Sequence, residues 1–108
     1  MTGQRVARHV EGFNAAVRSG DWSPFVATFS ADAVMSFVGV PAGPLRGREA
    51  IAAGYAANPP VDTLTVRQVA TEGDVDTLAF DWDAGGSGTM RLRWEGDALA
   101  ELVVAFAG

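Results

Sequence analysis

Apolar and polar residues alternate with a period of two along residues 77–84 and again along residues 89–95. This alternation predicts two strands that each bury one face in a sheet. We expect the buried face to consist of sulfur, aliphatic carbon and aromatic rings, with almost nothing that titrates. The inner face holds Leu78, Phe80, Trp82, Met90, Leu92 and Trp94, and the outer face holds Asp81, Asp83, Arg91 and Arg93.

The stretch 85–88, which reads Gly-Gly-Ser-Gly, is expected to turn between these strands. A five-residue loop at 85–89 sets Asp83 opposite Arg91 and Asp81 opposite Arg93, so that opposed residues share a face. Paired carboxylates also suit acid–base or glycoside chemistry, but this register favours a charged ladder on the outer surface. No helix follows the glycines, which favours a turn over a phosphate-binding loop.

The first half of the chain shows helical spacing instead. An apolar stripe at three- and four-residue spacing, from Val6 to Val17, predicts a helix over 3–19. Ser23-Pro24 is typical of a second helix start, with the serine as cap and an end near 29–30. The remaining expected elements are a strand at 33–38, a loop at 41–44, a helix at 47–57, and strands at 63–71 and 99–106. Segregation of helices and strands in this way predicts an α+β fold.

Composition narrows the number of domains, the kinds of partner and the kinds of site that the chain can have. The 108 residues, 48% hydrophobic and 19% charged, fit one domain spanning 1–108. A net charge of −5 argues against nucleic acid as a partner. The chain has no Cys and one His, so we expect no disulfide, no metal site and no cofactor. No apolar run is long enough to span a membrane and no secretion signal is evident, so we expect a cytoplasmic protein.

Three segments carry a family resemblance. Residues 13–22 (FNAAVRSGDW) look like the end of a first helix with a small-Gly-Asp turn. Residues 25–34 (FVATFSADAV) look like a short helix that leads into a strand, and Gly47-Arg48-Glu49-Ala50-Ile51, followed by Tyr55, looks like a third helix. In order and spacing they resemble the nuclear-transport-factor-2-like superfamily, in its SnoaL-like and ketosteroid-isomerase-like branch. The resemblance implies a cystatin-like α+β barrel, in which a cone-shaped, curved antiparallel sheet wraps around three helices and leaves a pocket at the wide end.

The resemblance does not extend to the isomerase catalytic groups. In ketosteroid isomerases a Tyr, an Asp base and a protonated acid serve the reaction, and their positions here match Phe13, Phe37 and Met90. Enolisation needs a base and oxyanion donors, which these side chains do not supply. What survives is Tyr55, matching a supporting Tyr. Ketosteroid isomerase activity is therefore not expected, and whether the protein is an enzyme stays open.

Two polar residues are weak catalytic candidates. His9 lies one turn before Phe13 at the edge of the stripe; a half-exposed helix position is favoured over a pocket base. Tyr55 is expected to face inward, either towards a ligand or as a core aromatic with a backbone partner. The predicted ligand pocket comprises Phe13, Met35, Phe37, Tyr55, Phe80, Trp82, Met90, Leu92, Val104 and Phe106.

Three functions remain open. The first is binding of a hydrophobic metabolite, of polyketide, steroid or terpenoid type, in a mostly apolar pocket. The second is a non-catalytic dimerisation or partner-binding domain whose aromatics plug the cavity. The third is an epoxide-hydrolase- or cyclase-like enzyme, of which the hydrolase needs an inward Asp-Arg-Asp relay. For each we expect a homodimer through the outer sheet face, formed by Asp81, Asp83, Arg91, Arg93, Glu101 and Val103.

Overall fold

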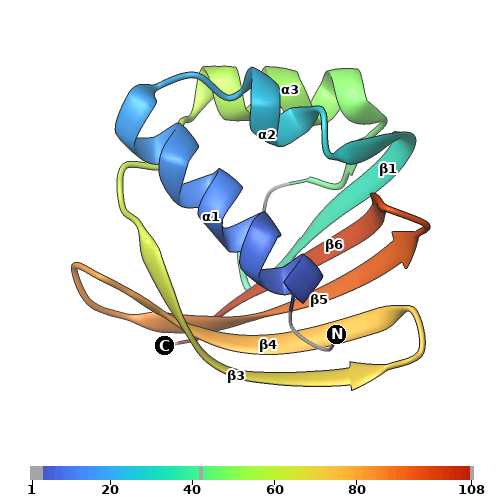
Figure 1. The fold of residues 1–108 in the computed structure, drawn as a ribbon. Helices are drawn as coiled ribbons and strands as arrows, with labels where there is room; N and C mark the ends of the chain where they lie inside the picture. The colour runs from blue at the N-terminus through green and yellow to red at the C-terminus, as the bar shows by residue number, and fades with distance from the viewer. Residues whose placement is uncertain (1–3, 42, 108) are drawn as a thin grey trace.

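The structure, a computed structural model, describes residues 4–41 and 43–107. Three helices lie on one side of a curved sheet, with α1 between the sheet and the other two helices (Figure 1). The helices are α1 (Gln4–Ser19), α2 (Ser23–Val26) and α3 (Arg48–Ala57). The strands are β1 (Phe29–Val38), β2 (Leu45–Arg46), β3 (Leu64–Glu72), β4 (Val75–Trp82), β5 (Ser87–Glu95) and β6 (Ala98–Ala107).

The six strands form one sheet in the order β2-β1-β6-β5-β4-β3. The predicted α+β class and curved sheet are confirmed, and β3 to β6 form the expected antiparallel meander. One pairing differs from the expectation, because β1 runs parallel to β6. The chain reaches β6 through the whole meander, so the last strand returns beside the first in the same direction.

Irregular pairings occur at three places in the sheet. The register shifts between Val66 and Gln68 on β3, between Arg93 and Trp94 on β5, and within the first half of β1. An extra residue in one strand increases its local twist and bends it. These bulges accompany the curvature that lets the sheet wrap around the helices (Figure 1).

The β4–β5 hairpin has a different register from the one predicted. Thr77, rather than Asp83, pairs with Arg91, and Asp81 pairs with Ser87, so the predicted loop at 85–89 is wrong. The turn closes earlier, where the Trp82 N–H donates to the Gly86 carbonyl at 2.9 Å. The displacement is an even number of residues, so every side chain keeps its predicted face.

Gly88 explains why the turn closes there. Its position on β5 faces inward opposite Phe80, and a Cβ at Gly88 would lie 2.8 Å from that ring and 2.5 Å from the Ala105 carbonyl oxygen. Glycine thus lets a large ring occupy space that a side chain at residue 88 would need.

The helix ends follow local chemistry. Arg18 occupies the last turn of α1, and Gly20 follows at φ 79° with its N–H donating to the Ala16 carbonyl, so α1 ends at residue 19 as predicted. The second helix is shorter than expected and ends at Val26. Ser23 is the first residue of this helix and not its cap. Its N–H instead donates a hydrogen bond to the Asp21 carboxylate at 3.1 Å.

The core lies between the helices and the inner sheet face. Its centre is an aromatic cluster in which Phe25 packs against Phe13, Trp22, Phe29 and Tyr55 with ring centroids 5.4–5.9 Å apart. All four pairs are edge-to-face, an arrangement that aromatic quadrupoles favour. None of the described helices is both long and apolar enough to cross a membrane.

Candidate functional site

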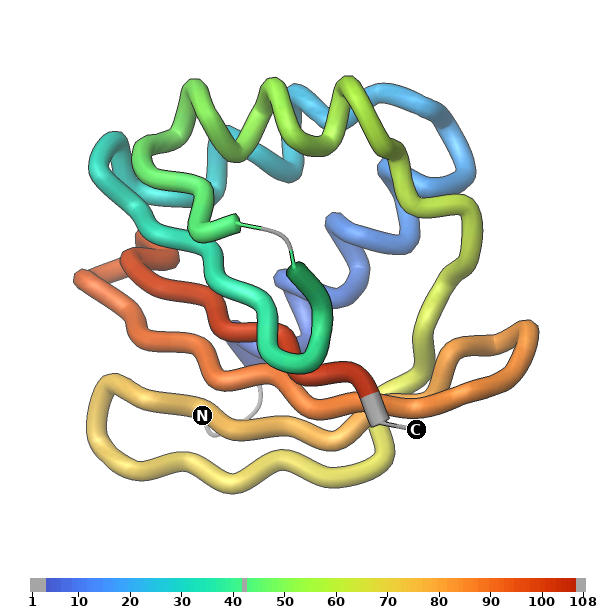
Figure 2. Tube along the Cα trace, turned by 180° about the vertical axis from the view of Figure 1, so that it is seen from behind, coloured from blue at the N-terminus to red at the C-terminus, as the bar shows by residue number. Residues whose placement is uncertain are grey.

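A cavity of about 410 Å³ lies between α1, α3 and the inner face of the sheet. The segment between β1 and α3, which passes below α3 in Figure 2, contributes Gly43 and Leu45 to its wall. At the rim, Phe37 and Phe106 stack with centroids 6.4 Å apart, and Phe106 is 41% exposed. The complete lining is His9, Phe13, Met35, Phe37, Gly43, Leu45, Gly54, Tyr55, Asn58, Pro60, Trp82, Met90, Leu102, Val104 and Phe106.

Two residues of the predicted pocket do not line this apolar cavity. Phe80 and Leu92 are both fully buried, so they belong to the packed core below it. The Phe80 ring occupies the space that a side chain at Gly88 would need, and it meets the Trp82 ring edge-to-face with centroids 5.2 Å apart. The other eight predicted pocket residues all border the cavity. Sequence reasoning missed Leu45, Asn58, Pro60 and Leu102 among its walls.

The three residues that the resemblance matches to polar groups of ketosteroid isomerases all border the cavity. Phe13 extends from α1, Phe37 from β1 and Met90 from β5. Their side chains present rings and a thioether where the resemblance implies a Tyr, an Asp and a protonated acid. Among the described lining residues there is no Asp, Glu, Lys or Arg, so the wall carries no permanent charge.

His9 is buried rather than half-exposed, and that expectation is wrong. Its side chain lies inside the cone among Phe25, Phe29 and Trp94, with ring centroids 5.0–6.4 Å away. The residue is 5% exposed, and its Nδ1 has no hydrogen-bond partner among the described residues. Burial lowers the pKa of His9 to about 4, so the imidazole is neutral near pH 7.

Tyr55 faces inward from α3, as expected. Its ring stacks on Trp22 with centroids 4.6 Å apart and planes 10° from parallel. Burial raises the pKa of the Tyr55 hydroxyl well above its usual value of 10.0, so the group stays a neutral donor and acceptor. No described residue hydrogen-bonds to this hydroxyl, so the backbone partner expected under the core-aromatic alternative is not found there. Together, His9, Tyr55 and Asn58 are the polar side chains of the wall.

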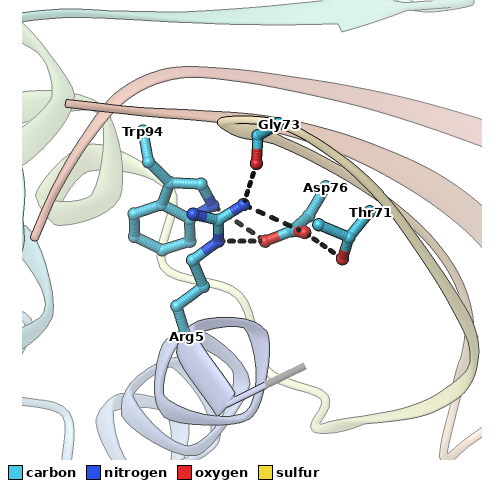
Figure 3. A network of polar contacts seen from close by, with 5 residues as sticks. All are labelled: Arg5, Thr71, Gly73, Asp76 and Trp94. Atoms are coloured by element: carbon cyan, nitrogen blue, oxygen red, sulfur yellow. Dashed lines mark hydrogen bonds and ion pairs between the residues drawn. The ribbon is translucent and has the colours of Figure 1, made fainter. Parts of the chain in front are cut away.

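The expectation of an interior with almost nothing that titrates is also wrong at Asp76. This carboxylate on β4 is fully buried and faces α1, from which Arg5 extends to it (Figure 3). Oδ2 accepts from Arg5 Nε at 2.6 Å and from Trp94 Nε1 at 3.0 Å, while Oδ1 accepts from Thr71 Oγ1 at 2.6 Å and Arg5 Nη2 at 3.3 Å. Arg5 also donates to the Gly73 carbonyl and lies 5.6 Å from the Trp94 ring centroid.

These bonds determine the charge of Asp76. Burial alone would raise the pKa of this carboxyl, but hydrogen bonds from Arg5, Thr71 and Trp94 and the positive charge of Arg5 hold it below its usual value. Both oxygens are occupied, and Asp76 borders neither the apolar cavity nor the cleft described next. We therefore regard Asp76 as a structural anchor for α1 and not as a base for a ligand.

A second, polar cleft of about 390 Å³ opens at the N-terminal end of α1. Its walls include Arg5, Arg8, Thr71 and Trp94. His9 borders both this cleft and the apolar cavity, so this residue lies between the two. The cleft has the charged lining of a surface depression, whereas the apolar cavity has the composition of a small-molecule site.

The outer sheet face carries the charged residues predicted for it, in different pairs. Asp81 pairs with Arg67 on β3 at 2.8 Å, and Glu101 on β6 lies 3.3 Å from Arg91 and 3.7 Å from Arg93. The predicted ladder between Asp83 or Asp81 and the two arginines is wrong because the hairpin register differs.

Asp83 and Val103 are two further residues predicted to lie on the outer face. Asp83 accepts hydrogen bonds from the hydroxyls of Thr63 and Thr65, which lower its pKa. Val103 lies opposite Arg91 and is partly exposed. Association of two copies through this face stays a prediction.

Comparison with known proteins places the fold. A family model described as a SnoaL-like domain matches residues 10–103. The chain belongs to the SnoaL-like family. No curated protein matches the sequence. The match covers α2, α3, the part of α1 from residue 10 onward and almost the whole sheet of this SnoaL-like domain, and includes Phe13, Phe37, Tyr55 and Met90 of the cavity wall.

Solved structures agree with this assignment. A Bacillus subtilis protein provisionally described as an isomerase is 15% identical, with TM-score 0.81 over 96% of this chain and 87% of that one. A hypothetical Catenulispora acidiphila protein with a ketosteroid-isomerase-like fold, in complex with trimethylamine, is 17% identical, with TM-score 0.77 over 99% and 88%. A Sinorhizobium meliloti protein provisionally described as a polyketide cyclase is 17% identical, with TM-score 0.71 over 94% and 98%. At these identities the likeness establishes the fold of the SnoaL-like domain.

Proposed function

We propose that this SnoaL-like domain binds a small hydrophobic metabolite, of polyketide, steroid or terpenoid type, in the apolar cavity. The observation that carries the proposal is the cavity itself: about 410 Å³ of space with aromatic and aliphatic walls and three polar side chains. Ligand sites commonly have a volume of roughly 300–1,000 Å³ and such a lining. The structural neighbours provisionally described as a polyketide cyclase and a ketosteroid isomerase are consistent with it.

The two alternatives have less support. A plugged domain requires that rings such as Phe13, Phe37 and Trp82 fill the interior, whereas these rings form the wall of an open space. An epoxide hydrolase requires acidic groups that reach the substrate, and no described residue of the wall is acidic. The inward pair of Asp76 and Arg5 lies outside that wall and is internally satisfied.

Binding without ketosteroid isomerase chemistry is the form of the proposal that the polar groups favour. A general base works best with a pKa near the working pH. The pKa of His9, about 4, lies too low for an effective base near pH 7, and burial shifts the Tyr55 hydroxyl away from ionisation. Both groups are better suited to hydrogen-bond a ligand than to remove a proton from it.

Adjacent valines on β6 provide a matched test. Val104 borders the cavity, whereas its neighbour Val103 faces outward. We expect N-phenyl-1-naphthylamine, an uncharged fluorescent probe, to bind the unmodified chain and Val103→Phe saturably. Val104→Phe should weaken binding about tenfold or more, because lost contacts equal to two methylene groups cost about 0.8 kcal/mol each. Equal affinity of the two variants would place the probe outside the cavity and refute the proposal.

A further inference from the structure

We propose that the ligand of the apolar cavity is an uncharged molecule with a hydroxyl group, which hydrogen-bonds to the imidazole of His9. This inference rests on the proposed function and specifies the chemical class of the ligand. Two features carry it: His9, a residue of the cavity wall, has a buried ring nitrogen without a partner among the described residues, and the described wall carries no charge.

The first feature is the unpaired nitrogen. Most buried polar side-chain atoms in native proteins have a hydrogen-bond partner, and an exception calls for an explanation. Nδ1 of His9 is the single such exception among the side chains that the structure describes. The ring is otherwise surrounded by Phe25, Phe29 and Trp94, which offer it aromatic contacts. A phenylalanine could make the same contacts without leaving a nitrogen unpaired, so packing alone does not account for a histidine here.

The second feature is the lack of charge. No described residue of the wall is an acid, a lysine or an arginine, and His9 itself is neutral near pH 7. A carboxylate or sulfonate transferred into this cavity would lose its hydration without gaining a counter-ion, which is costly. A hydroxyl both donates and accepts a hydrogen bond, so it can satisfy whichever ring nitrogen faces it. An uncharged alcohol or phenol therefore fits the wall better than an acid.

His9 also differs from Tyr55 in its position. The two rings both pack on Phe25, at 5.0 and 5.5 Å, but Tyr55 is stacked flat on Trp22 and is fixed by it. His9 is the polar residue that the cavity shares with the polar cleft, at the end where its ring packs against Phe25 and Phe29. We assign the hydroxyl of the ligand to that end and its hydrocarbon body to the wall formed by Phe37, Met90 and Val104 in the wider part.

Three compounds with the same bicyclic cage test this assignment: borneol, which carries a hydroxyl; bornane, which carries no polar group; and camphorsulfonate, which carries an anion. By calorimetric titration we expect borneol to bind the unmodified chain about tenfold more tightly than bornane, because one satisfied buried polar group contributes on this scale. Camphorsulfonate should bind more weakly than borneol. In His9→Phe the preference for borneol over bornane should disappear, whereas the control variant Val103→Phe, a change on the outer sheet face, should retain it.

Stability adds a readout that a purely structural histidine would not give. His9→Phe should melt no lower than the unmodified protein, since it removes an unpaired buried nitrogen. The unmodified chain gives an independent measurement, because His9 is its only histidine. In an ¹⁵N spectrum of the imidazole, borneol should shift the ring nitrogens and bornane should leave them nearly unchanged. This measurement decides the matter even if a variant does not fold.

The outcomes separate the two proposals. If bornane and borneol bind with equal affinity, or if the preference for borneol survives in His9→Phe, the hydroxyl assignment is wrong while a hydrophobic cavity site stands. If none of the three compounds binds, and N-phenyl-1-naphthylamine does not either, the proposed function fails together with the inference.

Discussion

Two buried polar groups, Asp76 and His9, lie beneath or within α1 and differ in what surrounds them. The carboxylate of Asp76 accepts four hydrogen bonds from Arg5, Thr71 and Trp94 (Figure 3). Nδ1 of His9, one helical turn after Arg5, has no partner among the described residues. Trp94 lies between them: its Nε1 bonds to Asp76 and its ring meets the His9 ring edge-on at 6.4 Å.

The difference separates structure from function. A buried charge with complete partners can hold its surroundings in place, but it has no bonding capacity left for a ligand. A buried nitrogen without a partner destabilises the fold, but it can still form a hydrogen bond with a ligand. Burial alone would have ranked Asp76 and His9 as equal candidates for a functional role. Their hydrogen-bond partners distinguish the satisfied carboxylate from the histidine that we propose as the ligand's partner.

The largest expected effect comes from breaking the complete network. Arg5→Met leaves Asp76 fully buried with only the neutral donors Thr71 and Trp94. We expect a loss of about 3–5 kcal/mol in the free energy of unfolding, the usual cost of stranding a buried charge. Asp76→Asn should cost less, about 1–3 kcal/mol, because Arg5, with a side chain 31% exposed, can turn to water. Urea denaturation measures both losses.

A double variant is the control for this prediction. Arg5→Met combined with Asp76→Leu removes both charges, so it should be more stable than Arg5→Met alone despite carrying one more substitution. If Arg5→Met alone unfolds like the unmodified protein, the Asp76 network is not an anchor and the contrast with His9 loses its basis.

The next effect is a dependence on pH that arises from His9. The pKa of this residue is about 4 in the folded protein and 6.5 in a free side chain. Between these values the unfolded chain binds a proton that the folded chain does not. The stability associated with neutral, buried His9 is therefore fully present above pH 6.5. As the pH falls towards 4, the free energy of unfolding decreases by about 3 kcal/mol in total.

His9→Phe isolates this contribution. The variant should lose much less stability between pH 7 and pH 4 than the unmodified chain, as measured by denaturant titration at several pH values. Carboxylates also begin to titrate near pH 4, but they do so in both proteins and cancel in the difference. Parallel pH profiles of the two proteins would show that His9 is not buried in the neutral form, contrary to its role here.

Sequence pattern predicted the fold and the inner faces because both depend on period and order alone. Leu78, Phe80 and Trp82 face inward as the alternation requires, even though the hairpin closes elsewhere. Register was not predictable in the same way, since the stretch 85–88 permits several turns of similar cost. The register depends on the close contact between Phe80 and Gly88. The sequence does not show that these two residues pair until the register is already known.

The two buried polar residues were open to prediction in part. Asp76 lies two residues before Leu78, in phase with the inward series, but the predicted strand began at residue 77 and so left Asp76 out. His9 falls at the spacing of the apolar stripe of α1, between Val6 and Phe13. Whether a residue at the edge of such a stripe is covered depends on how far the sheet curls, which local sequence does not encode. The open cavity depends likewise on side-chain packing.

The smallest expected effect completes the comparison, because the outer face repeats the ion pair of Arg5 and Asp76 without its burial. Arg67 and Asp81 lie 2.8 Å apart, yet their side chains are 52% and 48% exposed. Water solvates each charge when its partner is removed, so Asp81→Asn should change the free energy of unfolding by about 1 kcal/mol or less. The change should shrink further in high salt, which screens exposed pairs, whereas the loss in Arg5→Met should persist. A cost for Asp81→Asn equal to that of Arg5→Met would mean that burial is not what separates the two pairs.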